Sequence, residues 1–280
     1  MAFSIESLLK QSAPDKSLGD IALMNECLDS LQSESAVKEK MAESLAVMRE
    51  SAEKGLEPSL KSMSGMTGGQ AAKYAALSQG GNSASGDVTS YAGFVAMAVA
   101  EYNACMGKIV AAPTAGACGV LPGVLFALEK YAGATRDELI MALFAAAAIG
   151  EVIANRASIS GAQSGCQAEI GAAAAMAAAA AAQLRGGSAK QACQAASFAL
   201  MNLMGLVCDP VRGLVEIPCV YRNVAGASIA LTAADMALCG IDFPIPPDEV
   251  IDAMGRVGAM LPAALRETGE GGCASCPSAR

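Results

Sequence analysis

The segment from Ile170 to Ala182 reads IGAAAAMAAAAAA and carries no charged side chain. Alanine has the highest helix propensity and loses no side-chain entropy on burial, so this segment predicts a helix. A helix that is apolar on every face must be surrounded by other helices, because none of its faces suits contact with water. The segment therefore predicts a buried, alanine-rich central helix around which the rest of the fold is built.

The rest of the chain alternates apolar segments with short Gly/Ser-rich turns, and the alternating β-branched pattern of strands is nearly absent. We therefore predict an all-α fold, with residues 1–280 forming a single helical domain whose Gly/Ser loops converge at one end. Residues 1–60 are expected to form peripheral amphipathic helices, 61–265 the helical core that carries the site, and 266–280 a tail. Helices are predicted over residues 35–54, 89–106, 121–131, 136–155, 168–184, 188–206, 223–239 and 248–260.

The composition limits the partners that the chain can have. Its 280 residues include 19 Lys and Arg against 27 Asp and Glu, which gives a net charge of −8. This acidic balance argues against nucleic acid or an anionic membrane surface as a partner. The longest apolar runs, about 139–150 and 170–182, are shorter than the ~18 to 20 residues of a membrane-spanning helix. We therefore expect neither nucleic acid nor a membrane among the partners.

Histidine is absent, whereas cysteine occurs ten times. The chain therefore cannot supply a Ser-His-Asp triad, a histidine-ligated zinc site or the usual general base of enzymes. The first ten residues, MAFSIESLLK, lack the basic and then apolar pattern of a secretory signal. Ten cysteines in such a chain indicate reduced thiols in the cytoplasm, and some of these thiols are expected to bind metal.

Three cysteines, Cys166, Cys208 and Cys219, fall in predicted loops. Cys208 follows Cys166 by 42 residues, about one helical hairpin, and precedes Cys219 by 11. Such a hairpin would return the chain to the same end of the bundle. Three thiolates without histidine suit an iron–sulfur cluster with one open iron, which is a Lewis acid able to bind a hydroxyl group. The alternative is that all three are small buried residues, because free cysteine is often buried.

The other cysteines have simpler interpretations. Cys118 lies in a tight glycine-containing turn, whereas the C-x-x-C motif of Cys273 and Cys276 would suit a redox pair, half a metal site or two exposed thiols. The remaining cysteines fall in predicted helices and are expected in the core: Cys27, Cys105, Cys193 and Cys239.

Three loops place hydroxyl groups and small residues beside predicted helix starts, an arrangement that suits a carboxylate or a phosphate. No nucleotide-binding glycine motif is present, so we expect a small anionic substrate rather than a nucleotide. Lys108 and Arg156 flank two of the loops and would supply positive charge. The alternative is that the loops are only caps and turns. The candidate substrate-binding residues are Ser64, Thr67, Lys108, Thr114, Gly116 and Ser160.

Six motifs together resemble the iron–sulfur-dependent L-serine dehydratases (L-serine ammonia-lyases), specifically the separate α chain of the two-subunit form. The similarity extends from the N-terminal helix to the tail. The motifs are SGMTGG (64–69), KIVAAPTAGACG (108–119), NRASISGAQSGCQ (155–167), GLVCDP (205–210), GLVEIPC (213–219) and RET (266–268).

The resemblance implies an all-helical catalytic domain in which Cys166, Cys208 and Cys219 bind a [4Fe–4S] cluster with one open iron. L-serine would bind this iron through its hydroxyl group and be converted to pyruvate and ammonia, a reaction of serine catabolism that feeds gluconeogenesis. In single-chain relatives a cysteine near the end ligates the fourth iron, but Cys273 and Cys276 do not occupy the penultimate position of those chains. A homo- or hetero-oligomer is expected.

This chain has no histidine to act as the catalytic base, so either a Lys, Tyr, carboxylate or thiolate acts as the base or another polypeptide supplies it. The resemblance implies that a partner β chain carries a histidine-containing segment. We expect the isolated chain to be poorly active. Arg212 also departs from the small residue usual in the family. Two other interpretations stay open: a pyridoxal-phosphate (PLP) dehydratase with Lys108 as its Schiff-base lysine, and a non-catalytic helical iron–sulfur scaffold or redox-sensing subunit.

Overall fold

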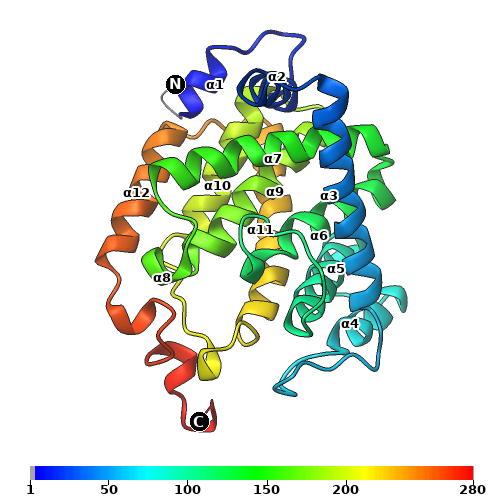
Figure 1. Cartoon of the computed structure of the whole chain (residues 1–280), viewed down its shortest axis with the longest axis vertical. Helices are drawn as coiled ribbons and strands as arrows, with labels where there is room; N and C mark the ends of the chain where they lie inside the picture. Colours follow the sequence, from blue (N-terminus) through cyan, green and yellow to red (C-terminus); the bar gives the residue numbers. More distant parts are fainter. Residues whose placement is uncertain (1–3, 280) are drawn as a thin grey trace.

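The computed structural model describes residues 4–279, and within that range the chain forms helices joined by loops, with no β-strand (Figure 1). Cys208 and Arg266 form an isolated bridge between two extended segments. The prediction of an all-α fold is confirmed.

The alanine-rich segment forms helix α9 (Ala172–Leu184) in the middle of the molecule (Figure 1). Every residue from Ala172 to Ala182 is buried. Removing this apolar surface from water stabilises the fold, and the small methyl groups allow neighbouring helices to cover it on all sides. The helices that pack directly against α9 are α6 (Val120–Ala132), α7 (Arg136–Arg156), α10 (Ala189–Leu203) and α11 (Cys219–Leu238).

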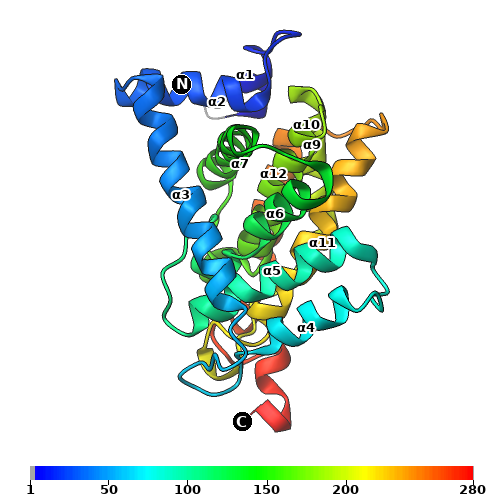
Figure 2. The ribbon, with the colours of Figure 1, turned by 90° about the vertical axis from the view of Figure 1, so that its right-hand side faces the viewer.

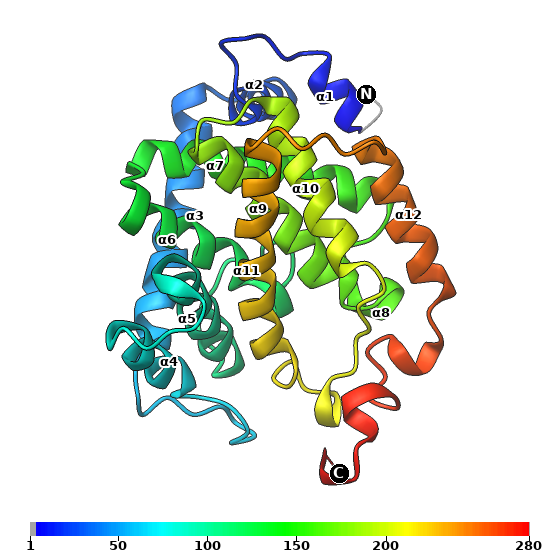
Figure 3. The ribbon, with the colours of Figure 1, turned by 180° about the vertical axis from the view of Figure 1, so that it is seen from behind.

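A second group of helices covers this inner bundle. α5 (Gly86–Ala104) packs against α6 and α11, and α3 (Glu34–Gly55) and α4 (Gln70–Gln79) cover α5. α2 (Leu18–Ser30) packs on α7, and α12 (Pro247–Met260) on α10. Figures 2 and 3 show α3 and α12 on different sides of the bundle. The remaining α-helices are short: α1 (Ile5–Leu9) and α8 (Gly161–Ser164).

Helix α3 matches the amphipathic helix predicted over residues 35–54, and its buried side chains include Val37 and Leu45. Gly55, where the sequence predicts a stop, is its last residue. A β carbon at Gly55 would collide with the backbone of Ala98 in α5. The glycine is therefore required by the close approach of the two helices.

The contact between α5 and α6 is equally close. A β carbon on Gly123 would lie 2.5 Å from the carbonyl oxygen of Ala92 and 3.0 Å from the β carbon of Ala96. We expect Gly123→Ala to lower the free energy of unfolding by about 1–3 kcal/mol, because the backbone of α5 must move. Gly171→Ala is the control, since its methyl group would meet only side-chain atoms at 3.6 Å or more. Urea denaturation measures the free energy of unfolding of both variants. If Gly123→Ala is as stable as Gly171→Ala, the close contact between α5 and α6 is contradicted.

Some boundaries differ from the prediction. α4 lies between two predicted turns, in a segment for which no helix is predicted, and the last inner helix, α11, begins at Cys219 rather than near Asn223. The expectation that Cys239 lies in the core is wrong: its side chain is exposed, because α11 ends at Leu238 and the chain turns outward at Gly240. Cys193 and Cys118 are buried, whereas Cys27 and Cys105 are half-buried.

The loops that carry the candidate residues gather toward one end of the bundle. In Figure 1 the loop before α4, the yellow segment before α11 and the C-terminal tail lie at this end, below the helices. The N-terminal helices α1 and α2 lie at the opposite end. Within residues 4–279, no helix combines the length and the apolar character needed to cross a membrane.

Candidate functional site

Cys166, Cys208 and Cys219 occupy three structural settings at this end of the bundle. Cys166 directly precedes a short π-helix (Gln167–Gly171), Cys208 lies in an extended segment, and Cys219 is the first residue of α11. Helices α9 and α10 form the hairpin that separates the first two cysteines. All three are free thiols with exposed fractions of 2%, 3% and 7%.

The buried amide of Gln167 fixes the segment of Cys166 against the segment that leads to Cys208. The Gln167 backbone N–H donates to the Leu206 carbonyl over 2.9 Å, and the Gly205 N–H donates to Gln167 Oε1 over 2.8 Å. Gln167 Nε2 donates to the carbonyls of Ser164 and Met254. These bonds hold two loops from either end of the α9–α10 hairpin side by side.

Arg222 connects the first turn of α11 to the same segment. Its Nη1 donates to the Val207 carbonyl over 2.7 Å and forms an ion pair with Asp209 Oδ1 over 2.8 Å. Because Arg222 lies three residues after Cys219, these contacts bring that cysteine toward Cys208.

The three thiols share a buried environment and influence one another electrostatically. Burial raises the pKa of Cys166 to about 11 and the pKa of Cys219 to about 12, and it raises the pKa of Cys208 as well. The charge of Cys166 further raises the pKa of Cys208 and Cys219. Arg222 opposes the shift at Cys166 and Cys219. Buried thiols of this kind become thiolates only when a strong positive charge binds them.

The donor set fits a cluster better than a single ion. In the described part of the chain, no three Cys, Asp or Glu side chains are arranged to hold one metal ion. In a cubane each thiolate binds a different iron, so the sulfurs need not meet at one point. Three buried cysteines on converging segments, without a histidine in the chain, meet that requirement.

Glu169 lies beside these cysteines, on the π-helix that follows Cys166. Its Oε1 accepts a hydrogen bond of 2.7 Å from Thr114 Oγ1. Burial raises the pKa of Glu169, and the charge of Glu267 raises it further, whereas Thr114 opposes the shift. π-Helical turns within α-helices occur frequently at functional sites. Glu169 is a residue that sequence reasoning missed, although it is a charged side chain at the entry to a polyalanine helix.

Two predicted substrate-binding residues, Ser64 and Thr67, donate their hydroxyl groups to Glu216. Both bonds are 2.8 Å long and end on Oε2, which also accepts the hydroxyl of Ser62 over 2.6 Å. Glu216 lies between Cys208 and Cys219 in the chain, so the bonds attach the loop before α4 to the segment that carries those cysteines.

The start of α4, which follows this loop, binds a carboxylate side chain of the protein itself. The backbone N–H groups of Gly68, Gln70 and Ala71 donate to the fully buried Glu101. The end of the loop over 64–69, which the sequence predicts to bind an anionic ligand, is therefore attached through Gly68 to a carboxylate of α5.

We expect Glu216→Ala to release the loop before α4, because three hydroxyl groups lose a charged acceptor. The loss is about 1–3 kcal/mol in the free energy of unfolding. Hydrogen–deuterium exchange should become faster over residues 62–69. Glu57→Ala is the control, since the exposed carboxylate of Glu57 accepts, within residues 4–279, only from its neighbour Ser59. Unchanged exchange over residues 62–69 in Glu216→Ala would show that this carboxylate does not hold the loop.

Asn223 joins a second loop to the cysteines and was missed by sequence reasoning, as were Arg222 and Glu216. Its Oδ1 accepts from the Gly119 N–H over 2.9 Å, and its Nδ2 donates to the carbonyls of Gly116 and Cys219. Gly116 is near Glu169 as well, because a β carbon there would lie 3.2 Å from Oε1. Thr114 and Gly116 are thus brought to the site.

The remaining predicted residues lie in different surroundings. Ser160 is half-buried and precedes Gly161, which lies between Glu169 and Cys208. Lys108 is exposed, and its charge acts on Glu50 of α3 rather than on the three thiols.

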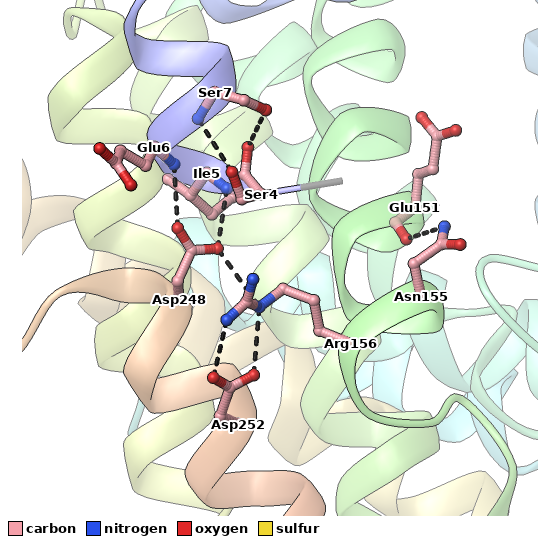
Figure 4. Close-up of polar contacts among 9 residues, drawn as sticks. All are labelled: Ser4, Ile5, Glu6, Ser7, Glu151, Asn155, Arg156, Asp248 and Asp252. Carbon is pink, nitrogen blue, oxygen red and sulfur yellow. Dashed lines mark hydrogen bonds and ion pairs between the residues drawn. The ribbon is translucent and has the colours of Figure 1, made fainter. Parts of the chain in front are cut away.

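Arg156 faces α12 rather than a ligand. Its guanidinium donates to both carboxylate oxygens of Asp252, over 3.1 and 2.7 Å, and lies 3.5 Å from Asp248 (Figure 4). Asp248 also accepts the backbone N–H groups of Ile5 and Glu6, which anchors α1. Its positive charge is therefore paired with carboxylates of α12 at the end of α7.

The C-terminal tail is fastened to the cysteine segment through Asp209. Its Oδ2 accepts from the Cys273 backbone N–H over 2.7 Å. The side chains of Cys273 and Cys276 are exposed. Arg212 has a positive φ of 56° and an exposed side chain.

The family model described as "serine dehydratase alpha chain" matches residues 14–274. A probable L-serine dehydratase alpha chain of Bacillus subtilis is 49% identical over 263 residues, which cover 94% of this chain and 87% of the relative. A probable L-serine dehydratase alpha chain of Latilactobacillus sakei is 55% identical over 183 residues, covering 65% and 88%. The L-serine dehydratase alpha chain of Peptoniphilus asaccharolyticus is 42% identical over 255 residues, covering 91% and 87%. The chain therefore belongs to the family of serine dehydratase alpha chains.

Proposed function

We propose that this chain is the α chain of an L-serine ammonia-lyase, which converts L-serine to pyruvate and ammonia. The observation that carries the proposal is the convergence of three buried, free thiols in a member of this family. The reaction removes the Cα proton and the β-hydroxyl group as water. The resulting aminoacrylate becomes an imine, which water hydrolyses to pyruvate and ammonia.

Cys166, Cys208 and Cys219 would hold a [4Fe–4S] cluster. When bound, such a cluster supplies a Lewis-acidic iron that lacks a protein thiolate and helps a hydroxyl group to leave. The chain's own part is to fix the three ligands. Gln167 and Arg222 hold their segments together through backbone carbonyls, and bonds of this kind orient metal ligands.

The residues around the thiols would shape the substrate pocket. Glu216 holds the loop of Ser64 and Thr67 against the cysteine segment. Asn223 fixes the turn of Gly116 beside Cys219. This arrangement favours a small substrate enclosed between two loops.

A proton acceptor for the Cα–H bond is expected from a partner chain. Histidine is the side chain with an ordinary pKa nearest neutrality, and this chain has none. The relatives named alpha chains imply a β chain. We propose that both chains form a cytoplasmic hetero-oligomer that serves serine catabolism and gluconeogenesis. The exposure of Lys108 does not favour the PLP-dependent alternative.

The direct test is to purify the chain anaerobically together with its β chain and to supply L-serine. We expect equal amounts of pyruvate and ammonia, and loss of activity in air, because an incompletely ligated iron is readily oxidised. Formation of products that survives hours of exposure to air and the removal of iron would contradict the proposal. The scaffold alternative predicts no products and no spectral response to L-serine.

A further inference from the structure

We propose that Glu169 binds the α-ammonium group of the substrate and so selects amino acids over 2-hydroxy acids of the same shape. The inference rests on the proposed function and names the chemical group that the site recognises. Three features of the molecule carry it: a carboxylate oxygen without a donor, the charges around it, and its position beside the Cys208 thiol.

The two oxygens of Glu169 have different surroundings. Oε1 accepts the hydroxyl of Thr114 over 2.7 Å. Within residues 4–279, no donor forms a hydrogen bond with Oε2. An ionised carboxylate can accept several hydrogen bonds, and a partly buried one without enough donors loses free energy. Oε2 can therefore accept a hydrogen bond from a donor group of the ligand.

The charges near Glu169 favour a cation. In the described part of the chain, no Lys or Arg forms an ion pair with Glu169. The nearby groups that interact with it are Glu267 and the thiols of Cys166, Cys208 and Cys219. Arg222 is engaged with Asp209 and the Val207 carbonyl. An ammonium group would offset this excess of acidic groups.

Oε2 lies beside the cysteines. A β carbon placed on Gly161 would lie 2.5 Å from Glu169 Oε2 and 3.1 Å from Cys208 Sγ. Glu169 Oε2 and Cys208 Sγ therefore both approach one point beside Gly161, where even a methyl group would collide with the carboxylate. A β carbon on Gly116 would lie 3.2 Å from Oε1. The two glycines thus let their loops pack closely against a carboxylate that lies next to the Cys208 thiol.

The experiment compares ligands that differ in the ammonium group. Ethanolamine carries an ammonium and a hydroxyl group, whereas L-glycerate is L-serine with a hydroxyl in place of the ammonium. Each is titrated into the anaerobic two-chain holoenzyme, and the cluster's absorption spectrum gives the dissociation constant. KM and kcat for L-serine are measured in parallel. The variants are Glu169→Gln, Glu169→Asp and, as the control, Glu270→Gln, which removes an exposed carboxylate of the tail.

In Glu169→Gln, we expect ethanolamine binding to weaken and KM for L-serine to rise by roughly 10- to 100-fold, because a charge-assisted bond is lost. L-glycerate should bind as well as before, or more tightly, since a nearby negative charge is gone. Glu169→Asp should recover part of the ethanolamine affinity, and Glu270→Gln should resemble the wild type. Equal iron and sulfide contents establish that all variants carry the cluster.

Two results would overturn the inference. One is an equal loss of affinity for ethanolamine and L-glycerate, which would indicate a general disturbance of the pocket. The other is a fall in kcat with KM and ethanolamine affinity unchanged, which would assign Glu169 to proton transfer. A wild-type holoenzyme whose spectrum does not respond to L-serine would instead overturn the proposed function, and the inference with it.

Discussion

Cys208→Ser is expected to lower the iron and sulfide content of the chain and to reduce the turnover of L-serine by at least ~100-fold. This loss of turnover is larger than the roughly 10- to 100-fold that is typical when a residue supporting a metal ligand is changed. Cys208 lies on the segment that connects the parts of the site. Its neighbours Leu206, Val207 and Asp209 form hydrogen bonds with Gln167, with Arg222 and with the C-terminal tail, respectively. A serine hydroxyl is a much weaker ligand for iron than a thiolate. The change in volume is small, so the helical fold should survive.

The matched control is Cys239→Ser, because Cys239 is exposed at the end of α11. Iron and acid-labile sulfide are measured anaerobically beside circular dichroism for both variants. The control should keep its cluster and activity. If Cys208→Ser keeps a full complement of iron and normal turnover, Cys208 is not a ligand. If Cys239→Ser loses iron equally, the loss is not specific to the site.

Adding the β chain is expected to raise the turnover of the cluster-loaded α chain by ~100- to 10,000-fold, the usual contribution of a positioned general acid or base. The reason is the absence of histidine from all 280 residues. Glu169, the carboxylate beside the thiols, is assigned to the ammonium group of the substrate rather than to the Cα proton. An anaerobic assay measures pyruvate release by the α chain alone and after titration with the β chain.

Histidine-to-alanine variants of the β chain serve as the control for this prediction. The variant that removes the proton acceptor should bind the α chain normally, as measured by size-exclusion chromatography, yet fail to raise turnover. Full turnover by the α chain alone would contradict the account, because the proton acceptor would then lie within this chain.

The helices were predictable because their cause is local. Ala172–Ala182 can only be a buried helix, and the apolar spacing in residues 35–54 requires an amphipathic one. The end of α11 was less predictable: Cys239 is apolar enough for a core, and only the turn at Gly240 takes it out to solvent. Local pattern cannot show which end of an apolar helix protrudes.

The cysteines of the candidate site could be predicted from the sequence, whereas the contacts that hold their segments in place could not. Cysteine type and loop position are visible in the chain, so Cys166, Cys208 and Cys219 could be named. The partner of Thr67 could not, because Glu216 lies 149 residues away. Hydroxyl groups that look free in the sequence can thus be engaged by a distant carboxylate. Arg156 shows the same limit, since its carboxylate partners lie on α12.

The most direct test is a ⁵⁷Fe Mössbauer spectrum of the anaerobic holoenzyme with and without L-serine. Three thiolates that hold a cubane leave one iron chemically distinct. The account therefore predicts that one of the four irons shifts when L-serine binds and that the other three do not. A single type of iron that L-serine leaves unchanged, or a spectrum without a four-iron cluster, would contradict it.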